Sequence, residues 1–158
     1  MDLTERQINV LVGSLLGDGC VYSPQTCSNA CYYLKQAKEN KEYLFWVFSE
    51  LDNLCGSEPK QRKDNAQWYF STRTLEELTY FKSLFYKNGT KIVPENIGDI
   101  LASPISLAVW FMEDGTLDYR EKYHCSFSIS THCFSVNDCW RLVKVLKNNF
   151  GIEATVYN

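Results

Sequence analysis

Apolar side chains recur at helical spacing in three places in the first part of the chain. Positions three and four apart predict one helix after Thr4, a second across residues 41–54 and a third after Thr74. Thr4 with Gln7, and Thr74 with Glu77, have the spacing of a capping box, in which each residue's side chain bonds the other's backbone N–H. We therefore expect helices to begin immediately after both threonines.

The pattern of helix starts returns in the second part of the chain. Ser103 followed by Pro104 predicts an N-cap with proline at the first helical position, opening a helix that runs to Met112. Ser135 with Asp138 predicts the start of a further helix. These two helices stand in the same order as the first two helices of the chain.

Short segments rich in aromatic and β-branched residues lie between the helices and are typical of strands. They cover residues 31–37, 59–63, 67–72, 125–131 and 154–157, and the Asp64-Asn65 pair predicts a hairpin turn. Residues 87–103 contain an Asn-Gly pair, Pro94 and Gly98, which is the composition of a linker.

The order of elements therefore repeats. Residues 4–86 read as helix, two strands, helix, two strands, helix, and the order starts again at Ser103. We predict an α+β fold with one half-domain over residues 1–92, a linker over 93–103 and a second half-domain over 104–158. The second copy lacks room for a final strand and helix, so we expect it to be incomplete.

Composition narrows the class of protein. The chain has 158 residues, of which 45% are hydrophobic and 15% aromatic, enough for a real core. It contains no run of about 18 apolar residues, and its first ten residues are polar and charged, so neither a membrane span nor a signal peptide is expected. Seven cysteines, an odd number without a secretory signal, indicate a reducing intracellular compartment.

Two other interpretations, a zinc site and catalytic histidines, have less support in the sequence. Cys27 and Cys31 could begin a zinc site, which needs a second pair of ligands. The residues that could supply it lie in or beside a predicted strand with poor ligand geometry: His124, Cys125, His132 and Cys133. We expect the two histidines to be surface residues and not catalytic ones.

Two helices end in the same way, and their ends carry the most informative chemistry. The helices finish in LGDG at residues 16–19 and MEDG at 112–115, where glycine could adopt the left-handed conformation that stops a helix. An aspartate there opposes the helix dipole by about 0.3–1 kcal/mol. One Asp-Gly pair alone is a common turn. Two at matching points of a repeat indicate a cation such as Mg²⁺, which accepts carboxylate and carbonyl oxygens.

Glycines on the first helix indicate how the two aspartates meet. Gly13 and Gly17 are four residues apart on one face, and each costs about 1 kcal/mol relative to alanine in a helix. A second helix that approaches closely at this face would account for both. Asp18 and Asp114 would then lie together at one end of the helix pair.

These residues carry a resemblance to a known family. Residues 11–19 (LVGSLLGDG) and 107–115 (LAVWFMEDG) resemble the nine-residue motif of the LAGLIDADG homing endonucleases, in the type that has two motifs in one chain. The resemblance implies a pseudo-twofold pair of αββαββα half-domains with the motif helices at their interface. It also implies sequence-specific cleavage of both strands of double-stranded DNA at a long site, with Mg²⁺ or Mn²⁺.

The resemblance also assigns roles to individual residues. Asp18 and Asp114 would bind metal with help from the backbone carbonyls of Gly17 and Glu113. Gln36 matches a polar residue that orders active-site water, and Lys91 matches a basic residue beside that water. The motif has small residues where this chain has Val109 and Glu113, so we expect less symmetric helix packing.

Contact with DNA is expected on the sheet of the first half, despite a net charge of −3, because the distribution of basic groups matters more than their sum. Strand alternation places a set of basic and polar residues where they could reach bases and phosphates. This set is Lys35, Lys38, Lys60, Arg62, Lys63, Gln67, Tyr69 and Arg73. A second set of aromatic residues is expected in the core beneath the sheet: Tyr43, Phe45, Trp46, Phe48, Tyr80, Phe81, Phe85 and Tyr86.

Two alternatives share the same scaffold: a maturase that binds intron RNA, and a DNA-binding protein without catalysis. The presence of both Asp18 and Asp114 favours the nuclease, since a binding protein has no need to hold two carboxylates together. A complete two-half chain is expected to act as a monomer. The resemblance places it in an organelle (mitochondrion or chloroplast) or in bacterial or phage cytoplasm.

Overall fold

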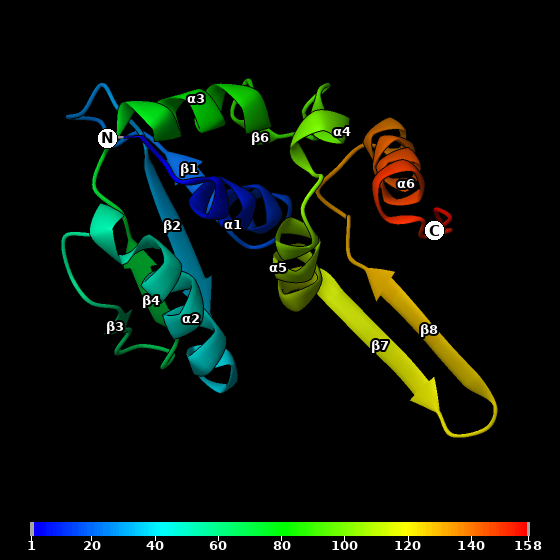
Figure 1. The fold of residues 1–158 in the computed structure, drawn as a ribbon. Coiled ribbons are helices and arrows are strands. Elements are labelled where there is room, and N and C mark those ends of the chain that lie inside the picture. Colours follow the sequence, from blue (N-terminus) through cyan, green and yellow to red (C-terminus); the bar gives the residue numbers. More distant parts are fainter. Residues whose placement is uncertain (1, 158) are drawn as a thin grey trace.

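The computed structural model describes residues 2–157, and its two halves meet where helices α1 and α5 lie side by side (Figure 1). The first half has the order αββαββα. Its elements are α1 (Glu5–Leu16), β1 (Cys20–Tyr22), β2 (Cys31–Gln36), α2 (Lys41–Leu51), β3 (Lys60–Gln61), β4 (Trp68–Ser71) and α3 (Glu76–Phe85). Short 3₁₀ turns flank α2 at η1 (Lys38–Asn40) and η2 (Asp52–Leu54).

The second half repeats the first four of these elements. They are α5 (Pro104–Asp114), β7 (Gly115–Arg120), β8 (His124–Ile129) and α6 (Val136–Phe150). Residues 151–157 have no regular secondary structure, so the strand expected at 154–157 is wrong. A strand needs a hydrogen-bonded neighbour, and the β7–β8 sheet has two strands only within the described residues.

Most of the predicted helix starts are confirmed by side-chain caps. Thr4 and Gln7 form the full capping box, with N···O distances of 3.2 and 3.1 Å, and α1 begins at Glu5. Ser103 and Ser135 cap α5 and α6. The predicted start after Thr74 is wrong, because the Leu75 N–H donates to the Ala30 carbonyl at 2.9 Å and keeps this segment extended before α3.

The segment expected to be a linker has structure of its own. It contains the hairpin β5 (Tyr86–Lys87) and β6 (Thr90–Lys91) and the short helix α4 (Ile97–Ile100). Val93, Ile97 and Leu101 are buried in the core, and α4 packs against α6. Apolar residues between the Asn-Gly turn and Ser103 therefore join the two halves as packed structure.

The first half is built on an antiparallel sheet of order β1-β2-β4-β3. One face, with Tyr32, Leu34 and Phe70, lies against α2 and α3, and Phe48 of α2 packs edge-on to Phe70 at 5.5 Å between ring centroids. The prediction that all the aromatics of α2 and α3 lie in the core is wrong for Trp46 and Tyr80, which are 38% and 61% exposed.

Candidate active site

The interface between α1 and α5 is close because α1 has glycine where the helices cross. A Cβ on Gly13 would lie 2.8 Å from Val109 Cβ and closer still to the Ser106 carbonyl oxygen. Ser106 and Val109 are both buried there. The predicted close approach is confirmed, and the bulky Val109 is accommodated because its partner position has no side chain.

An Asp-Gly pair follows or closes each helix, and the two pairs lie at the same end of this interface, because the Asp18 N–H donates to Glu113 Oε2 at 2.7 Å. The glycines were expected to adopt the left-handed conformation, and that is wrong: Gly19 and Gly115 are absent from the positive-φ residues, and Gly115 has φ −81°. Space is the reason for glycine here. A Cβ on Gly19 would lie 2.8 Å from the Tyr32 ring, and one on Gly115 would overlap Phe111.

The two aspartates lie close enough to influence each other. The pKa of Asp114 is raised to about 6, first by burial and then by the negative charge of Asp18, while Lys91 and His132 act in the opposite direction. The ends of two helices therefore bring like charges together in a partly desolvated position. A cation between them would relieve the repulsion.

Gln36 holds the Asp18 side chain. Its amide Nε2 donates to Asp18 Oδ2 at 2.8 Å, and its Oε1 accepts from Asn40 Nδ2 at 3.2 Å. Gln36 is 5% exposed and comes from the buried face of β2. The amide thus restricts the orientation of the Asp18 carboxylate from the sheet side.

Lys91 reaches the end of α1 from strand β6. Its ammonium donates to the Gly17 and Gly19 carbonyl oxygens at 2.8 and 2.7 Å. Burial lowers the pKa of Lys91, and the nearby carboxylates Glu113 and Asp114 counteract that effect. A positive charge is therefore held at the C-terminal end of α1, where the helix dipole favours it.

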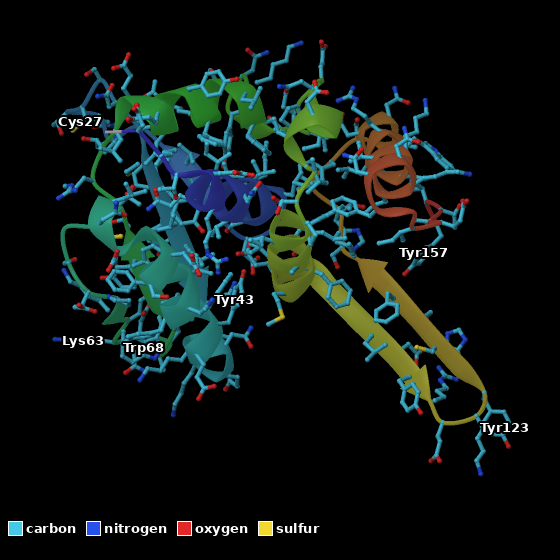
Figure 2. All side chains as sticks on the ribbon, in the orientation of Figure 1. Cys27, Tyr43, Lys63, Trp68, Tyr123 and Tyr157 are labelled. Carbon is cyan, nitrogen blue, oxygen red and sulfur yellow. The ribbon has the colours of Figure 1, made fainter. Side chains whose placement is uncertain are left out.

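The Glu113 carboxylate is a part of the site that sequence reasoning missed. Its Oε1 accepts from the hydroxyls of Ser14 and Tyr43 at 2.7 and 2.8 Å, and its Oε2 accepts from the Asp18 N–H at 2.7 Å and the Gly19 N–H at 3.3 Å. Tyr43 lies between α2 and α5 (Figure 2). From the sequence, only the backbone carbonyl of Glu113 was assigned a role, and the available signal for its side chain was its size at a position where the motif has a small residue.

Burial dominates the electrostatics of this carboxylate. It raises the pKa of Glu113 to about 7, although the hydrogen bonds from Ser14 and Tyr43 favour the charged form. Burial and the Glu113 charge together raise the pKa of Tyr43, so its hydroxyl is a stable donor. Ser14 continues the network to the buried Tyr32 hydroxyl at 2.6 Å.

The donor atoms at the helix ends have the chemistry of a magnesium or manganese site. Two carboxylates and helix-terminal carbonyls are hard oxygen ligands, and an ion with so few protein ligands keeps water or substrate in its other positions. The Gly17 carbonyl has a second lone pair beside its bond from Lys91. Among residues 2–157 no three His, Cys, Asp or Glu side chains cluster to hold a metal ion, so protein carboxylates alone do not enclose one.

The outer face of the first sheet collects several of the residues expected to contact DNA. The strand register places Lys35, Tyr69 and Lys60 directly across from one another on the face opposite Leu34 and Phe70. The Tyr69 ring lies beside Tyr33 in a tilted arrangement, with 5.9 Å between ring centroids. Arg62 continues the row of Lys60, and Lys63 lies at the outer edge of this half (Figure 2).

Other expected contact residues lie elsewhere. The Arg73 guanidinium donates to the Asn53 carbonyl at 2.6 Å and is held at η2, which follows α2. Gln67 lies in the β3–β4 turn, with its side chain bonded to Asn65, and Lys38 is exposed on η1. Arg62 also forms an ion pair with Asp64 at 2.8 Å.

The β7–β8 hairpin has one polar and one apolar face, a division that the sequence pattern did not predict. The register pairs Asp118 with Ser126 and Arg120 with His124 on one face, and Leu117 with Phe127 on the other. His124 is exposed and lies 2.9 Å from the Ser126 hydroxyl. His132, by contrast, lies near enough to Asp114 to influence its pKa.

All seven cysteines are free thiols. Cys27 is exposed, whereas Cys31 is buried with its thiol directed at the Tyr22 carbonyl. No helix within residues 2–157 combines the length and apolar character that crossing a membrane requires.

Comparisons with known proteins agree with this geometry. The model of the LAGLIDADG DNA endonuclease family matches residues 8–158. DNA endonuclease I-ChuI of Chlamydomonas applanata is 29% identical over 99% of this chain and 78% of its own length. The cytochrome b mRNA maturase bI2 of Saccharomyces cerevisiae is 27% identical over 94% of this chain, which spans only 38% of that relative.

Solved structures share the fold. The homing endonuclease I-WcaI, bound to its DNA recognition sequence, superposes with a TM-score of 0.88 at 23% identity, over 99% of this chain and 73% of that one. I-DmoI in complex with DNA and Mn superposes less closely, with a TM-score of 0.54 at 15% identity over 98% of this chain and 83% of that one. With a family match over almost its whole length, and with both motif helices side by side, this chain belongs to the LAGLIDADG DNA endonuclease family.

Proposed function

We propose that this protein is a divalent-metal-dependent endonuclease that cuts both strands of DNA at a long, specific site. The observation that carries the proposal is the pairing of Asp18 and Asp114 at the ends of two packed helices, where the charge of one raises the pKa of the other. Holding two carboxylates close together costs free energy that a bound cation would offset. A protein that only binds DNA has no need for such a pair.

The residues around Asp18 and Asp114 have different roles in the proposed reaction. Asp18 and Asp114 would hold Mg²⁺ or Mn²⁺, together with the carbonyls of Gly17 and Glu113, which lie at helix ends where backbone oxygens lack intrahelical donors. An ion bound there supplies positive charge to the scissile phosphate and lowers the pKa of a water molecule. Gln36 keeps the Asp18 carboxylate in one orientation.

Lys91 has a supporting electrostatic role. Its ammonium is anchored on two backbone carbonyls beside the aspartates, so it holds a positive charge near the phosphate without moving. Preorganised charge of this kind stabilises the negative charge that develops during phosphodiester cleavage. Lys35, Lys60, Arg62 and Lys63, on or beside the outer face of the first sheet, provide the contacts that hold the DNA backbone.

The nuclease is tested with supercoiled plasmid that carries the host sequence from which the intervening sequence encoding this chain has been removed. We expect linear product in Mg²⁺ or Mn²⁺ and none in EDTA. Asp18→Asn and Asp114→Asn should each abolish cutting while gel-shift binding of the same DNA persists. Asp99→Asn is the matched control, because Asp99 is exposed on α4. Normal cutting by either active-site variant contradicts the assignment.

A second function, intron RNA splicing, is favoured by a specific observation. Two of the similar proteins carry the name cytochrome b mRNA maturase bI2, from Saccharomyces cerevisiae and Debaryomyces hansenii, and are both 27% identical to this chain. A maturase should bind the intron that encodes it and restore its splicing in vitro. That activity should survive Asp18→Asn, since RNA binding does not require the paired carboxylates.

A further inference from the structure

The Glu113 side chain crosses the helix interface and bonds to the backbone of the opposite motif. It belongs to α5, yet its Oε2 accepts from the N–H groups of Asp18 and Gly19, which follow the end of α1. Its Oε1 is fixed in turn by the hydroxyls of Ser14 and Tyr43. A carboxylate with four donors has little freedom to move.

The two motifs are unequal at this point. Glu113 stands in its motif where Gly17 stands in the other, one residue before each aspartate. A Cβ on Gly17 would lie 2.6 Å from Glu113 Oε2 and 2.8 Å from Glu113 Cβ. The absence of a side chain at Gly17 therefore makes room for the Glu113 carboxylate, and the contact runs in one direction only, from the second motif to the first.

Asp18 is consequently held from two sides. Gln36 bonds its carboxylate at 2.8 Å, and Glu113 bonds its backbone N–H at 2.7 Å. A side-chain bond alone leaves the main chain after α1 free to rotate and carry the carboxylate with it. The backbone bond removes that freedom, and positional errors of about 1 Å can cost on the order of 100-fold in rate.

We propose that Glu113 is a positioning residue: through hydrogen bonds across the interface, its carboxylate fixes the backbone of Asp18 so that the Asp18 carboxylate faces Asp114. This proposal rests on the nuclease function proposed above. Hydrogen-bond acceptance, and not negative charge, is what the role requires.

Two substitutions of similar size distinguish the hydrogen bonds that the Glu113 side chain accepts from the space that it fills. In Glu113→Gln the amide oxygen can still accept from Asp18 and Gly19, while the NH₂ group donates to the hydroxyls of Ser14 and Tyr43, which can also accept. Glu113→Met fills the same space but accepts only weakly. Glu95→Gln and Glu95→Met are matched controls, because Glu95 is exposed ahead of α4.

The readouts are the single-turnover cleavage rate at saturating enzyme and, separately, the Kd for the same DNA without divalent metal. We expect Glu113→Met to lose on the order of 100-fold in rate with Kd changed less than about threefold. Glu113→Gln should stay within about tenfold of the wild-type rate. A wild-type rate for Glu113→Met, or an equal loss in Glu113→Gln, overturns the proposal.

Amide hydrogen exchange on the metal-free protein tests the same contact without measuring cleavage. The Asp18 amide should be protected in the wild-type chain and in Glu113→Gln, and exposed to exchange in Glu113→Met. Rapid exchange of this amide in the wild-type chain refutes the proposal even where Glu113→Met does not fold. A protected amide in a wild-type chain that cuts no DNA would instead contradict the nuclease function and leave the contact intact.

Discussion

Gly13→Ala probes the closeness of the two motif helices directly. The new methyl group would lie 2.8 Å from Val109 Cβ and closer to the Ser106 carbonyl, which belongs to the backbone of α5 and cannot rotate away. Distances below 3 Å are well inside van der Waals contact, so α1 and α5 would have to move apart. The substitution therefore perturbs the interface that brings Asp18 and Asp114 together.

Two opposing effects set the magnitude. Alanine is about 1 kcal/mol better than glycine inside a helix. Overpacking a buried contact costs about 1–3 kcal/mol. We take the upper end because the new methyl group would clash with both a backbone oxygen and a branched side chain. The net loss in the free energy of unfolding is about 2 kcal/mol, which corresponds to a fall in Tm of roughly 4–8 °C for a chain of this size.

Urea denaturation monitored by circular dichroism measures this loss of free energy, and the m-value should stay unchanged. The matched control is Gly98→Ala on α4, where a Cβ would lie 3.8 Å from Val145 Cγ2, an ordinary contact. That variant should be neutral or stabilised by up to about 1 kcal/mol. Equal stability of the Gly13→Ala and Gly98→Ala variants would refute the reasoning, because only one of the two sites is crowded.

Two further predictions concern charge. Replacing Lys60, Arg62 and Lys63 by alanine should lower the slope of log K against log salt for DNA binding by about 3, roughly 0.9 for each lost phosphate contact, and an unchanged slope would remove the sheet from the DNA interface. The second is pH dependence: the folded-state pKa of Glu113 is raised to about 7, so its contribution to stability is present at low pH and is lost as pH rises through 7. The free energy of unfolding of the metal-free protein, measured by urea denaturation, should fall by on the order of 1 kcal/mol between pH 6 and 8. Glu113→Gln should show a weaker dependence of this free energy on pH. The same pH dependence in that variant as in the wild-type chain would contradict the assignment.

The sequence by itself determined the local elements and the identity of the two acidic residues. Capping residues such as Thr4, Ser103 and Ser135 placed helix starts correctly, because a cap acts within three residues of itself. Gly13 and Gly17 indicated a close helix contact, since glycine inside a helix is costly without one. The two Asp-Gly ends indicated a paired site for the same reason: each is locally unfavourable.

Only the tertiary structure decided what surrounds those aspartates. The bonds of Glu113 to Asp18 and Tyr43 join residues 95 and 70 positions apart, and no local pattern encodes such a distance. The same holds for the start of α3, which pairing with Ala30 shifts past Thr74. It holds also for Gly19 and Gly115, which are needed for space against Tyr32 and Phe111 and not for a left-handed turn. Sequence pattern reports what each segment prefers alone, whereas these features depend on which segments meet.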